Sequence, residues 1–463
     1  MSSGDGKLVE RVQDEVGDPL KFQELLKREK VPVPAFLKAS PDPNLGDADL
    51  PVSRYTSYEF HRREVAKLWP KAWQLAGREE QVLNPGDHLV YDIVDASVIV
   101  MRGDDGRLRG FHNSCLHRGR ALRNVAGNTR ELRCPFHGFT WDLKGGFKSL
   151  PCAWDFQHLD RTKLDLPQVR VETWGGFVFV NFDEHAPPLI EYLGPLPQHF
   201  AGYLMDRSCT LVHVQRRIPC NWKVGQEAFF ESMHVRHTHP QIMTFIADVD
   251  SQYDVLHENV TRMITPSTVP SPNLADVPEA TVLYDSLAGS GRMSSSDADA
   301  HRLAEGGLAR EYIGEMNRAA FGAAAGADLS KATLAELQDA ILYSVFPNLQ
   351  IWAGYFANIV YRFIPDGDDP DHCLFDVRLL GRFPEGAARP PAPPVRRLAD
   401  DEPFTSAPEL GALGAVFEQD MRNLPYMMKG LKASKKGAVS LAHYQESRIR
   451  AHHATLDRYL DAK

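Results

Sequence analysis

Hydrophobic and polar positions change their period along the chain and divide the sequence into three regions. The first region, 1–70, has helical spacing over 21–30 (KFQELLKREK), and the prolines that follow end this helix. Thr56 and Glu59 have the spacing of a capping box, which predicts a second helix through about Leu68. We expect this region to form short helices and a proline-broken loop.

The second region, 71–183, alternates apolar and polar residues over short stretches, which is the pattern of β-strands. The segment 103–106 (GDDG) separates two of these stretches and is typical of a hairpin turn. The segment 175–182 (GGFVFVNF) predicts the closing strand. Strands of this kind can hold two loops rigidly opposite each other.

The third region, 184–463, mixes strand-like and helix-like stretches. A strand pattern over 210–220 (TLVHVQRRIPC) leads into a helical run that begins near Asn221. Residues 285–335 are rich in Ala, Gly, Ser and Asp, and their amphipathic stretches predict a mobile cover. The other predictions are strands at 349–365 and 372–384, a turn at 366–371, a surface loop at 384–397, and helices at 409–433 and 440–461.

Composition and charge describe an ordinary globular protein and exclude several kinds of partner. The 463 residues are 43% hydrophobic, and 52 basic against 61 acidic residues give a formal net charge of −9. We therefore expect no binding to nucleic acid and none to a membrane, because no apolar run approaches the roughly 20 residues of a membrane span. Residues 1–19 lack the apolar core of a secretory signal, and six cysteines are too few for a disulfide scaffold. We expect a cytoplasmic protein.

Two short motifs, CLH at 115–117 and CPFH at 134–137, place two thiols and two imidazoles within 23 residues. One iron held by two cysteines and another held by two histidines is the ligand set of a Rieske [2Fe–2S] cluster. Neutral imidazoles remove negative charge, which raises the reduction potential to roughly −150 to +300 mV. A structural zinc ion uses the same donors, but zinc fingers usually pair Cys with Cys and His with His in sequence. We interpret the motifs as a one-electron relay whose ligands are Cys115, His117, Cys134 and His137.

A second candidate metal site lies in 221–240 (NWKVGQEAFFESMHVRHTHP). Glu231, His234 and His239 offer two imidazoles and one carboxylate, which is the donor set of a mononuclear non-haem Fe(II) site. Glu231 and His234 share a helix face, whereas His234 and His239 are about 140° apart on a regular helix. Both histidines reach one metal only if the helix ends or bulges between them, and Pro240 predicts an ending. Histidines at this spacing also occur as plain surface or packing residues.

With both motifs in this order, the chain resembles the catalytic (α) subunit of a Rieske non-haem iron oxygenase, an aromatic ring-hydroxylating oxygenase. The runs CLHRG at 115–119, CPFHGFTWDLKGG at 134–146 and NWK at 221–223 carry the resemblance, which extends from about residue 55 onward. It implies an α+β fold with a β-rich Rieske [2Fe–2S] domain followed by a helix-grip (START-like) catalytic domain built from an antiparallel sheet and helices. The domains would be 71–183 and 184–463, with 1–70 as an N-terminal helical segment that packs on the catalytic domain.

The resemblance also assigns roles to the residues of the second site. His234 and His239 match the iron-binding histidines of the family. Glu231 matches a carboxylate that is not a ligand there and instead bridges the first histidine to a Rieske histidine of a neighbouring subunit. The family most often has Asp at this position, so Glu231 is a departure that weakens an assignment to the ring-dihydroxylating branch.

The third iron ligand would come from far downstream. The segment 416–431 (VFEQDMRNLPYMMKGL) resembles the helix that supplies it in the family, with Asp420 at the matching position. Glu418 is the nearest competitor, and Asp376 is a poorer one because it lies in a strand pattern.

The family implies a terminal oxygenase component that uses O2 and electrons delivered from NAD(P)H by a ferredoxin or flavin reductase. Each chain would carry one [2Fe–2S] Rieske cluster and one mononuclear Fe(II), in a homotrimer (α3) with or without a β subunit. Glu231 favours hydroxylation or demethylation of a small hydrophobic, aromatic or alicyclic substrate over cis-dihydroxylation of an aromatic ring. A Rieske electron carrier without oxygen chemistry and a zinc-scaffolded binding protein are the alternatives from other classes.

The substrate pocket is expected to be apolar and aromatic. Arg236 and Arg262 are the possible anchors for a carboxylated substrate, although no cluster of arginines demands one. The lining candidates, which are equally candidates for plain core residues, are Phe229, Phe230, Met233, Met243, Phe245, Phe346, Trp352 and Phe356.

Overall fold

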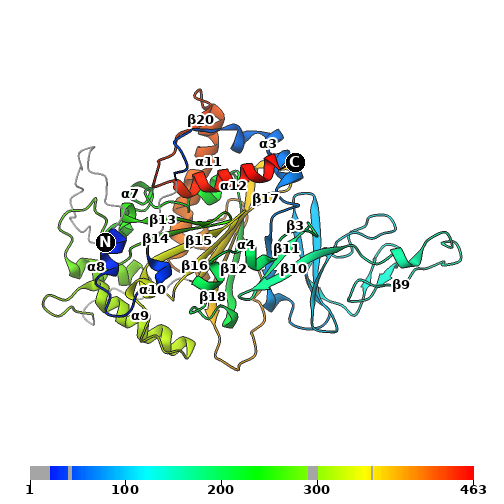
Figure 1. Ribbon diagram of the computed structural model, residues 1–463, viewed down its shortest axis with the longest axis horizontal. Helices are drawn as coiled ribbons and strands as arrows, with labels where there is room; N and C mark the ends of the chain where they lie inside the picture. Colours follow the sequence, from blue (N-terminus) through cyan, green and yellow to red (C-terminus); the bar gives the residue numbers. More distant parts are fainter. Residues whose placement is uncertain (1–20, 40–43, 290–300, 356–357, 463) are drawn as a thin grey trace.

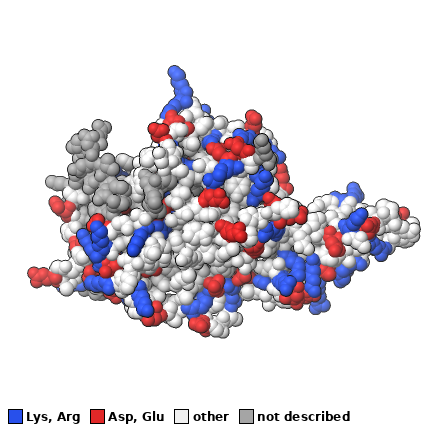
Figure 2. Space-filling model, in the orientation of Figure 1, with Lys and Arg blue, Asp and Glu red and all other residues white. Residues whose placement is uncertain are grey.

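The computed structural model describes residues 21–39, 44–289, 301–355 and 358–462, and Figure 1 shows their arrangement. Two large sheets, in which antiparallel pairing dominates, lie side by side, and most of the helices gather around one of them. The chain is therefore α+β, as the resemblance implied. Acidic and basic side chains are interspersed over the face drawn in Figure 2. None of the described helices combines the length and the apolar composition needed to cross a membrane.

The two Cys/His motifs belong to the smaller lobe at the right of Figure 1. A seven-stranded sheet with the order β2-β11-β10-β5-β4-β3-β6 forms its base, and a three-stranded sheet, β7-β8-β9, projects from it. The predicted turn at 103–106 is confirmed, because it joins the antiparallel strands β4 and β5. The predicted strand at 175–182 is β11, which pairs with both β10 and β2. The strands are β2 (Gln74–Arg78), β3 (Asp87–Ile93), β4 (Ala96–Arg102), β5 (Leu108–His112), β6 (Gly127–Asn128), β7 (Leu132–Arg133), β8 (Thr140–Trp141), β9 (Phe147–Ser149), β10 (Gln168–Trp174) and β11 (Phe177–Asn181).

The second sheet has eight strands in the order β13-β14-β15-β16-β17-β18-β12-β19. All neighbours are antiparallel except β12 and β19, which are parallel. The turn predicted at 366–371 is shorter than expected, because Asp366 still pairs with Asp369 across the hairpin. The loop predicted at 384–397 is irregular until it adds β19 to the sheet edge. The strands are β12 (Ser208–Ile218), β13 (Gln252–His257), β14 (Val260–Thr265), β15 (Ala340–Val345), β16 (Leu349–Ala353), β17 (Ile359–Asp366), β18 (Asp369–Arg382) and β19 (Arg396–Arg397). A separate pair joins β1 (Leu50–Pro51) to β20 (Ala438–Val439).

Helices cover this second sheet, and α12 runs across the top of it in Figure 1. The predicted capping box is wrong: Thr56 ends α2, and the side chain of Ser57 caps α3 by accepting from the Phe60 N–H. The predicted helix at 21–30 already ends at Leu26. The helices are α1 (Lys21–Leu26), α2 (Ser53–Thr56), α3 (Tyr58–Lys67), α4 (Leu189–Tyr192), α5 (Leu196–His199), α6 (Trp222–Glu227), α7 (Val235–Thr238), α8 (Glu279–Gly289), α9 (Ala309–Ala325), α10 (Leu334–Gln338), α11 (Leu413–Ala433) and α12 (Ser447–Asp461).

The mobile cover predicted at 285–335 lies partly outside the described residues, which omit 290–300. Its described parts form the end of α8, the whole of α9 and the start of α10. Whether this cover moves stays a prediction.

A buried ion pair ties the N-terminal α3 to α6, the helix that leads to the second candidate site. Lys223 Nζ lies 2.6 Å from Glu64 Oε1, and both side chains are fully buried. The indole N–H of Trp222 donates to the other oxygen of the same carboxylate at 3.3 Å. Burial lowers the pKa of Lys223, although Glu64 opposes this shift by stabilising the ammonium. At the start of α6, the Asn221 side chain caps the helix by accepting from the Lys223 N–H.

We expect Glu64→Ala to lower the free energy of unfolding by about 3–5 kcal/mol, because Lys223 is then buried without a counter-charge. Urea unfolding followed by tryptophan fluorescence measures this loss. The control Asp461→Ala removes an exposed partner of Arg63 on the same α3 and should leave the urea midpoint unchanged within error. Equal losses in the two variants would contradict the role of the buried pair.

Candidate functional site

The two Cys/His motifs form loops of the same shape. In each loop the cysteine carbonyl accepts from a glycine N–H four residues later: Gly119 at 2.9 Å in the first and Gly138 at 3.0 Å in the second. The cysteine N–H donates in turn to a carbonyl five residues later, at 2.9 Å for Cys115 and 2.8 Å for Cys134. Both glycines have positive φ, 72° and 76°, which a residue with a Cβ rarely adopts. We call 115–119 and 134–138 the cluster loops.

The cluster loops bring like donors together. The thiols of Cys115 and Cys134 contact each other in the interior, and the rings of His117 and His137 lie 4.7 Å apart. Burial raises the pKa of Cys115. Burial also acts on Cys134, but the N–H groups of the residues after it outweigh that effect and lower its pKa, which favours thiolate. His117 Nδ1 is buried and has no hydrogen-bond partner among the described residues. Two thiols lie together, two imidazoles lie together, and one buried imidazole nitrogen has no hydrogen-bond partner among the described residues. This arrangement fits a [2Fe–2S] cluster of the Rieske type, in which the cysteines bind one iron and the histidines bind the other.

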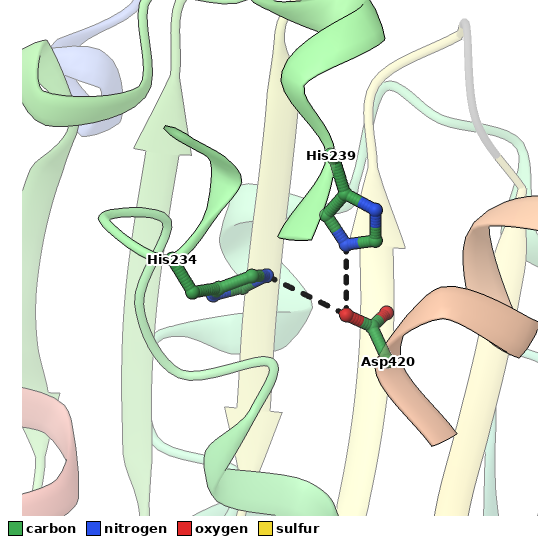
Figure 3. Close-up of side chains that lie close together, drawn as sticks. All are labelled: His234, His239 and Asp420. Atoms are coloured by element: carbon green, nitrogen blue, oxygen red, sulfur yellow. Dashed lines mark hydrogen bonds and ion pairs between the residues drawn. The ribbon is translucent and has the colours of Figure 1, made fainter. Parts of the chain in front are cut away.

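The second site brings together side chains from two distant segments, as Figure 3 shows. His234, His239 and Asp420 each offer a ligand atom, and the three atoms lie within 4.8 Å of one another. Asp420 Oδ1 is 2.7 Å from His239 Nε2 and 3.6 Å from His234 Nε2. Asp420 and His239 are 4% and 3% exposed, whereas the side chain of His234 is 26% exposed, so the triad is buried on two sides and accessible on the third.

The local backbone explains how both histidines reach that point. The helix α7 ends at Thr238, and His239 has φ −128° and ψ 50°, which confirms the predicted ending before Pro240. Glu231 and His234 do not share a regular helix as expected, because α6 ends at Glu227 and turns follow it. They still meet, since Glu231 accepts from both the backbone N–H and the ring of His234.

Hydrogen bonds on the far side of each imidazole set the ring orientation. His234 Nδ1 lies 2.7 Å from Glu231 Oε1, and His239 Nδ1 lies 2.8 Å from Gln419 Oε1. Because both partners are acceptors, each Nδ1 carries the proton and each Nε2 lone pair faces Asp420. Burial opposes protonation of His234, but the hydrogen bond and charge of Glu231 outweigh it and raise the pKa.

The two competing carboxylates lie elsewhere. Glu418 pairs with Arg216 at 2.8 Å and accepts from the Phe404 N–H. Asp376 is buried, accepts from His213 and pairs with Arg362. Neither belongs to the group of converging donors, whereas Asp420 does.

A cavity of about 660 Å³ opens beside the triad. Four of its lining side chains are carboxylates, namely Glu227, Glu231, Asp420 and Glu446, and none of its described lining residues is Lys or Arg. Its apolar wall comes from α6, α11, α12 and β20. The lining residues are Tyr55, Val224, Glu227, Ala228, Glu231, His234, Thr238, Asp420, Asn423, Leu424, Tyr426, Met427, Leu431, Val439, Ser440, Leu441, Glu446 and Ile449.

This lining differs from the one that the sequence predicted. None of the seven described candidates lines this cavity, and Phe356 lies outside the described residues. Phe229 stacks on Phe375 in the core, because the strands behind it supply an aromatic surface. Arg262 is not an anchor, since it is fully buried and pairs with Asp254.

Residues 204–462 match the family model described as the ring hydroxylating alpha subunit (catalytic domain), and residues 72–161 match the model of the Rieske [2Fe–2S] domain. The chain belongs to the ring-hydroxylating alpha subunits. The resemblance seen in the motifs is thereby confirmed.

Relatives of this alpha subunit include dioxygenases and monooxygenases. The chlorobenzene dioxygenase subunit alpha of Cupriavidus sp. (strain PS12) is 34% identical over 182 residues, which cover 38% of this chain and 40% of that protein. The carnitine monooxygenase oxygenase subunit of Acinetobacter pittii (strain PHEA-2) is 27% identical over 218 residues, which cover 45% and 56%. The chain thus spans about half the length of the curated relatives that it matches.

A crystal structure of a quaternary ammonium Rieske monooxygenase in complex with L-carnitine has the same fold. The match has a TM-score of 0.63 at 17% sequence identity and covers 92% of this chain and all of that one.

The alpha subunit holds a further carboxyl group that the sequence did not point to. Glu227, whose side chain is 11% exposed, faces the cavity and accepts from the Tyr55 hydroxyl at 3.1 Å. His453 Nε2 lies 2.8 Å from the same carboxyl group, and His453 Nδ1 lies 3.3 Å from Arg54. Because arginine only donates, Nδ1 accepts and the ring proton on Nε2 points at Glu227. Burial nevertheless raises the pKa of Glu227 to about 8.

Sequence reasoning missed these groups for different reasons. Gln419 directly precedes Asp420 in the sequence. Its position next to a predicted iron ligand was the signal that could have identified it as the hydrogen-bond acceptor of His239. Tyr55 and His453 lie far from Glu227 in the sequence, and no local pattern signals their contact.

We expect the raised pKa of Glu227 to make stability depend on pH. The folded chain keeps this proton up to about pH 8, whereas the unfolded chain releases it near pH 4.5, so stability falls as the pH rises between these values. The urea midpoint of the wild type should therefore fall relative to that of Glu227→Gln between pH 5 and pH 8. The exposed Glu184→Gln serves as the control and should follow the wild type. A difference between wild type and Glu227→Gln that stays constant with pH would argue against a protonated Glu227.

Proposed function

We propose that this alpha subunit is the terminal oxygenase component of a Rieske oxygenase system. It would use O2 and reductase-supplied electrons to hydroxylate or demethylate a small hydrophobic substrate. The observation that carries the proposal is the presence of two separate iron donor sets in one chain. Sorted thiols and imidazoles occupy the cluster loops, and the converging atoms of His234, His239 and Asp420 lie beside a cavity.

In this proposal Cys115, His117, Cys134 and His137 hold the [2Fe–2S] cluster. His234, His239 and Asp420 hold the mononuclear iron. When bound, the cluster supplies single electrons and the mononuclear iron supplies the centre at which O2 reacts beside the substrate.

The residues around the second site prepare it for that metal. Glu231 and Gln419 keep the protons of both histidines on Nδ1, so the Nε2 lone pairs need no rearrangement to bind iron. Asp420 is buried and contributes the negative charge that a divalent ion requires. The cavity opens on the side of the triad that His234 and Asp420 line.

We further propose that the subunits assemble head to tail in a trimer. Figure 1 draws β9, next to the second cluster loop, at the far right, and α11, which carries Asp420, near the top centre. Glu231 lines the cavity with one side and holds His234 with the other. In the assembly it would accept a hydrogen bond from His117 or His137 of the next copy, which shortens the path for an electron.

The named relatives define the substrates to test. Aromatic compounds are the substrates in the names of the dioxygenase relatives, and carnitine and choline appear in the names of monooxygenase relatives. A hydrophobic aromatic or alicyclic compound is our first choice, and quaternary ammonium compounds form the second class. A ferredoxin or flavin reductase would supply the electrons, a β subunit would be an optional partner, and the reducing cytoplasm suits the unpaired cysteines.

We expect substrate to trigger oxidation of the reduced protein. The iron-replete chain is reduced, O2 is admitted, and the visible absorbance of the cluster is followed with aromatic, terpenoid, methyl-ether and quaternary ammonium compounds. One class should accelerate reoxidation, and mass spectrometry of the product with 18O2 then distinguishes insertion of one oxygen atom from insertion of two. Glu231→Gln should keep both iron sites and the visible spectrum but lose turnover, whereas Glu184→Gln should behave like wild type. An absence of acceleration with full iron sites would favour an electron carrier, and a fully active Glu231→Gln would remove the bridge.

The iron content tests the assignment of the third ligand. Asp420→Ala should reduce the iron from about three atoms per chain to about two, because the cluster keeps its own pair. Glu418→Ala should retain all of the iron, since its carboxylate binds Arg216 instead. Elemental analysis with the visible spectrum of the cluster measures both. Loss of the third iron atom in Glu418→Ala alone would reverse the assignment.

A further inference from the structure

Among the described residues that line the cavity beside the triad, one carboxylate, Glu446, has no cationic or imidazole partner in the described part of the chain. Glu231 holds His234, Asp420 contacts His239, and Glu227 contacts His453. Glu446 accepts only the Ala442 N–H, at 2.5 Å, and no Lys or Arg among the described residues lies within ion-pair distance of it. Burial, with the nearby charge of Glu231, raises the pKa of Glu446. Glu446 is therefore free to pair with a cation that enters the cavity, and such a cation would relieve its repulsion from the neighbouring carboxylate of Glu231.

The cluster loops carry an exposed cation that has no anionic partner. Arg118 directly follows His117, and its guanidinium lies 5.4 Å from the centre of the Phe136 ring. No carboxylate of the described residues forms an ion pair with it, whereas the nearby Arg133 pairs with Glu131. Phe136 and Leu116, which flank the histidines, are 57% and 37% exposed. We call the surface formed by Leu116, Arg118 and Phe136 the tip of the cluster loops. The tip is thus an apolar surface that presents one free positive charge, and such surfaces are typical of contact sites.

The shapes and charges of the two features are complementary. The cavity offers an apolar wall with an excess of carboxylates, and the tip offers apolar side chains with an arginine. Arginine keeps its charge when water is removed, and its planar group can bind a carboxylate with two hydrogen bonds.

We propose that Arg118 of one copy enters the acidic cavity of the next copy and pairs with Glu446. This contact rests on the proposed head-to-tail assembly, and it would explain how two neighbouring copies of the chain are aligned with each other. Glu446 and Glu231 line the same cavity, and Arg118 is adjacent to His117 in the chain. Pairing of Arg118 with Glu446 therefore places a cluster histidine near Glu231 and fixes the register of the two copies. Arg118 and Glu446 act as positioning residues, because neither touches a proposed iron ligand through a hydrogen bond of its own.

Reversal of charge tests the pairing in the full, cluster-containing chain. Arg118→Glu and Glu446→Arg are measured singly and together by sedimentation equilibrium over a range of protein concentrations. Each single variant places like charges together and should weaken association by roughly 100-fold per interface. The double variant restores opposite charges and should regain most of the wild-type association. Arg107→Glu and Glu184→Arg, which change exposed side chains outside both features, should assemble like wild type.

The outcomes separate this pairing from the proposed function. The visible spectrum of the cluster shows that each variant has folded. Single variants that assemble like wild type, or a double variant that stays dissociated, would overturn the pairing while leaving the oxygenase assay untouched. Unchanged assembly with slower reduction by a ferredoxin would assign Arg118 to the electron donor instead and would also overturn it. If no substrate is turned over but the double variant rescues assembly, the oxygenase function fails and the pairing stands.

Discussion

The catalytic half is organised around the requirement that three donor atoms from two distant segments meet at one point. His234 and His239 are five residues apart, so they converge only because the chain leaves helical geometry between them. Asp420 arrives on α11, a long helix that the aromatic core holds in place through Phe417. Convergence of imidazole and carboxylate in a dry interior is costly without a cation, because the carboxylate charge is then balanced only by a histidine. This cost explains why the arrangement is supported by further hydrogen bonds on the outer side of both rings.

The cavity shows how one environment gives carboxyl groups different states. Glu231 donates nothing and holds the ring of His234 in one orientation. Glu227, only four residues earlier, is desolvated, and burial raises its pKa to about 8 although two donors face it. Glu446 accepts from a backbone N–H and lines the cavity. Three side chains of one type therefore differ in charge and role because their neighbours differ.

The two donor sets differ as strongly in exposure as in chemistry. The cluster loops are built on short strands and on glycines with positive φ, and in these tight loops the histidines are half-buried while the cysteines are fully buried. The triad lies behind helices and next to a sheet. The triad lies beside an open cavity, and the cluster loops carry exposed apolar side chains next to their histidines. The two surfaces are therefore suited to contact each other. Within one chain, however, they belong to separate lobes.

Local patterns in the sequence were enough to predict the features that depend on neighbours in the chain. The spacing of CLH and CPFH pointed to two thiols and two imidazoles that the structure brings together, and Pro240 predicted the end of the helix before it, because steric effects of proline act on the preceding residue. Alternating strands and the 103–106 turn were found for the same reason. The resemblance, rather than any periodicity, pointed to Asp420 across 181 positions from His239.

Only the tertiary structure decided the features that depend on chain segments far apart. Cys220 and Cys373 have no evident spacing, yet their sulfur atoms lie 3.7 Å apart because β12 pairs with β18. Phe229, Phe346 and Trp352, which were assigned to a pocket, instead pack in the core, since strand patterns show which side chains are buried but not which surface remains open. The cavity and the pKa of Glu227 arise from residues of α2, α6 and α12 that meet only on folding. Sequence therefore determined which candidate donor residues are present and their local backbone geometry, whereas packing determined the distances between them, their protonation and the cavity beside them.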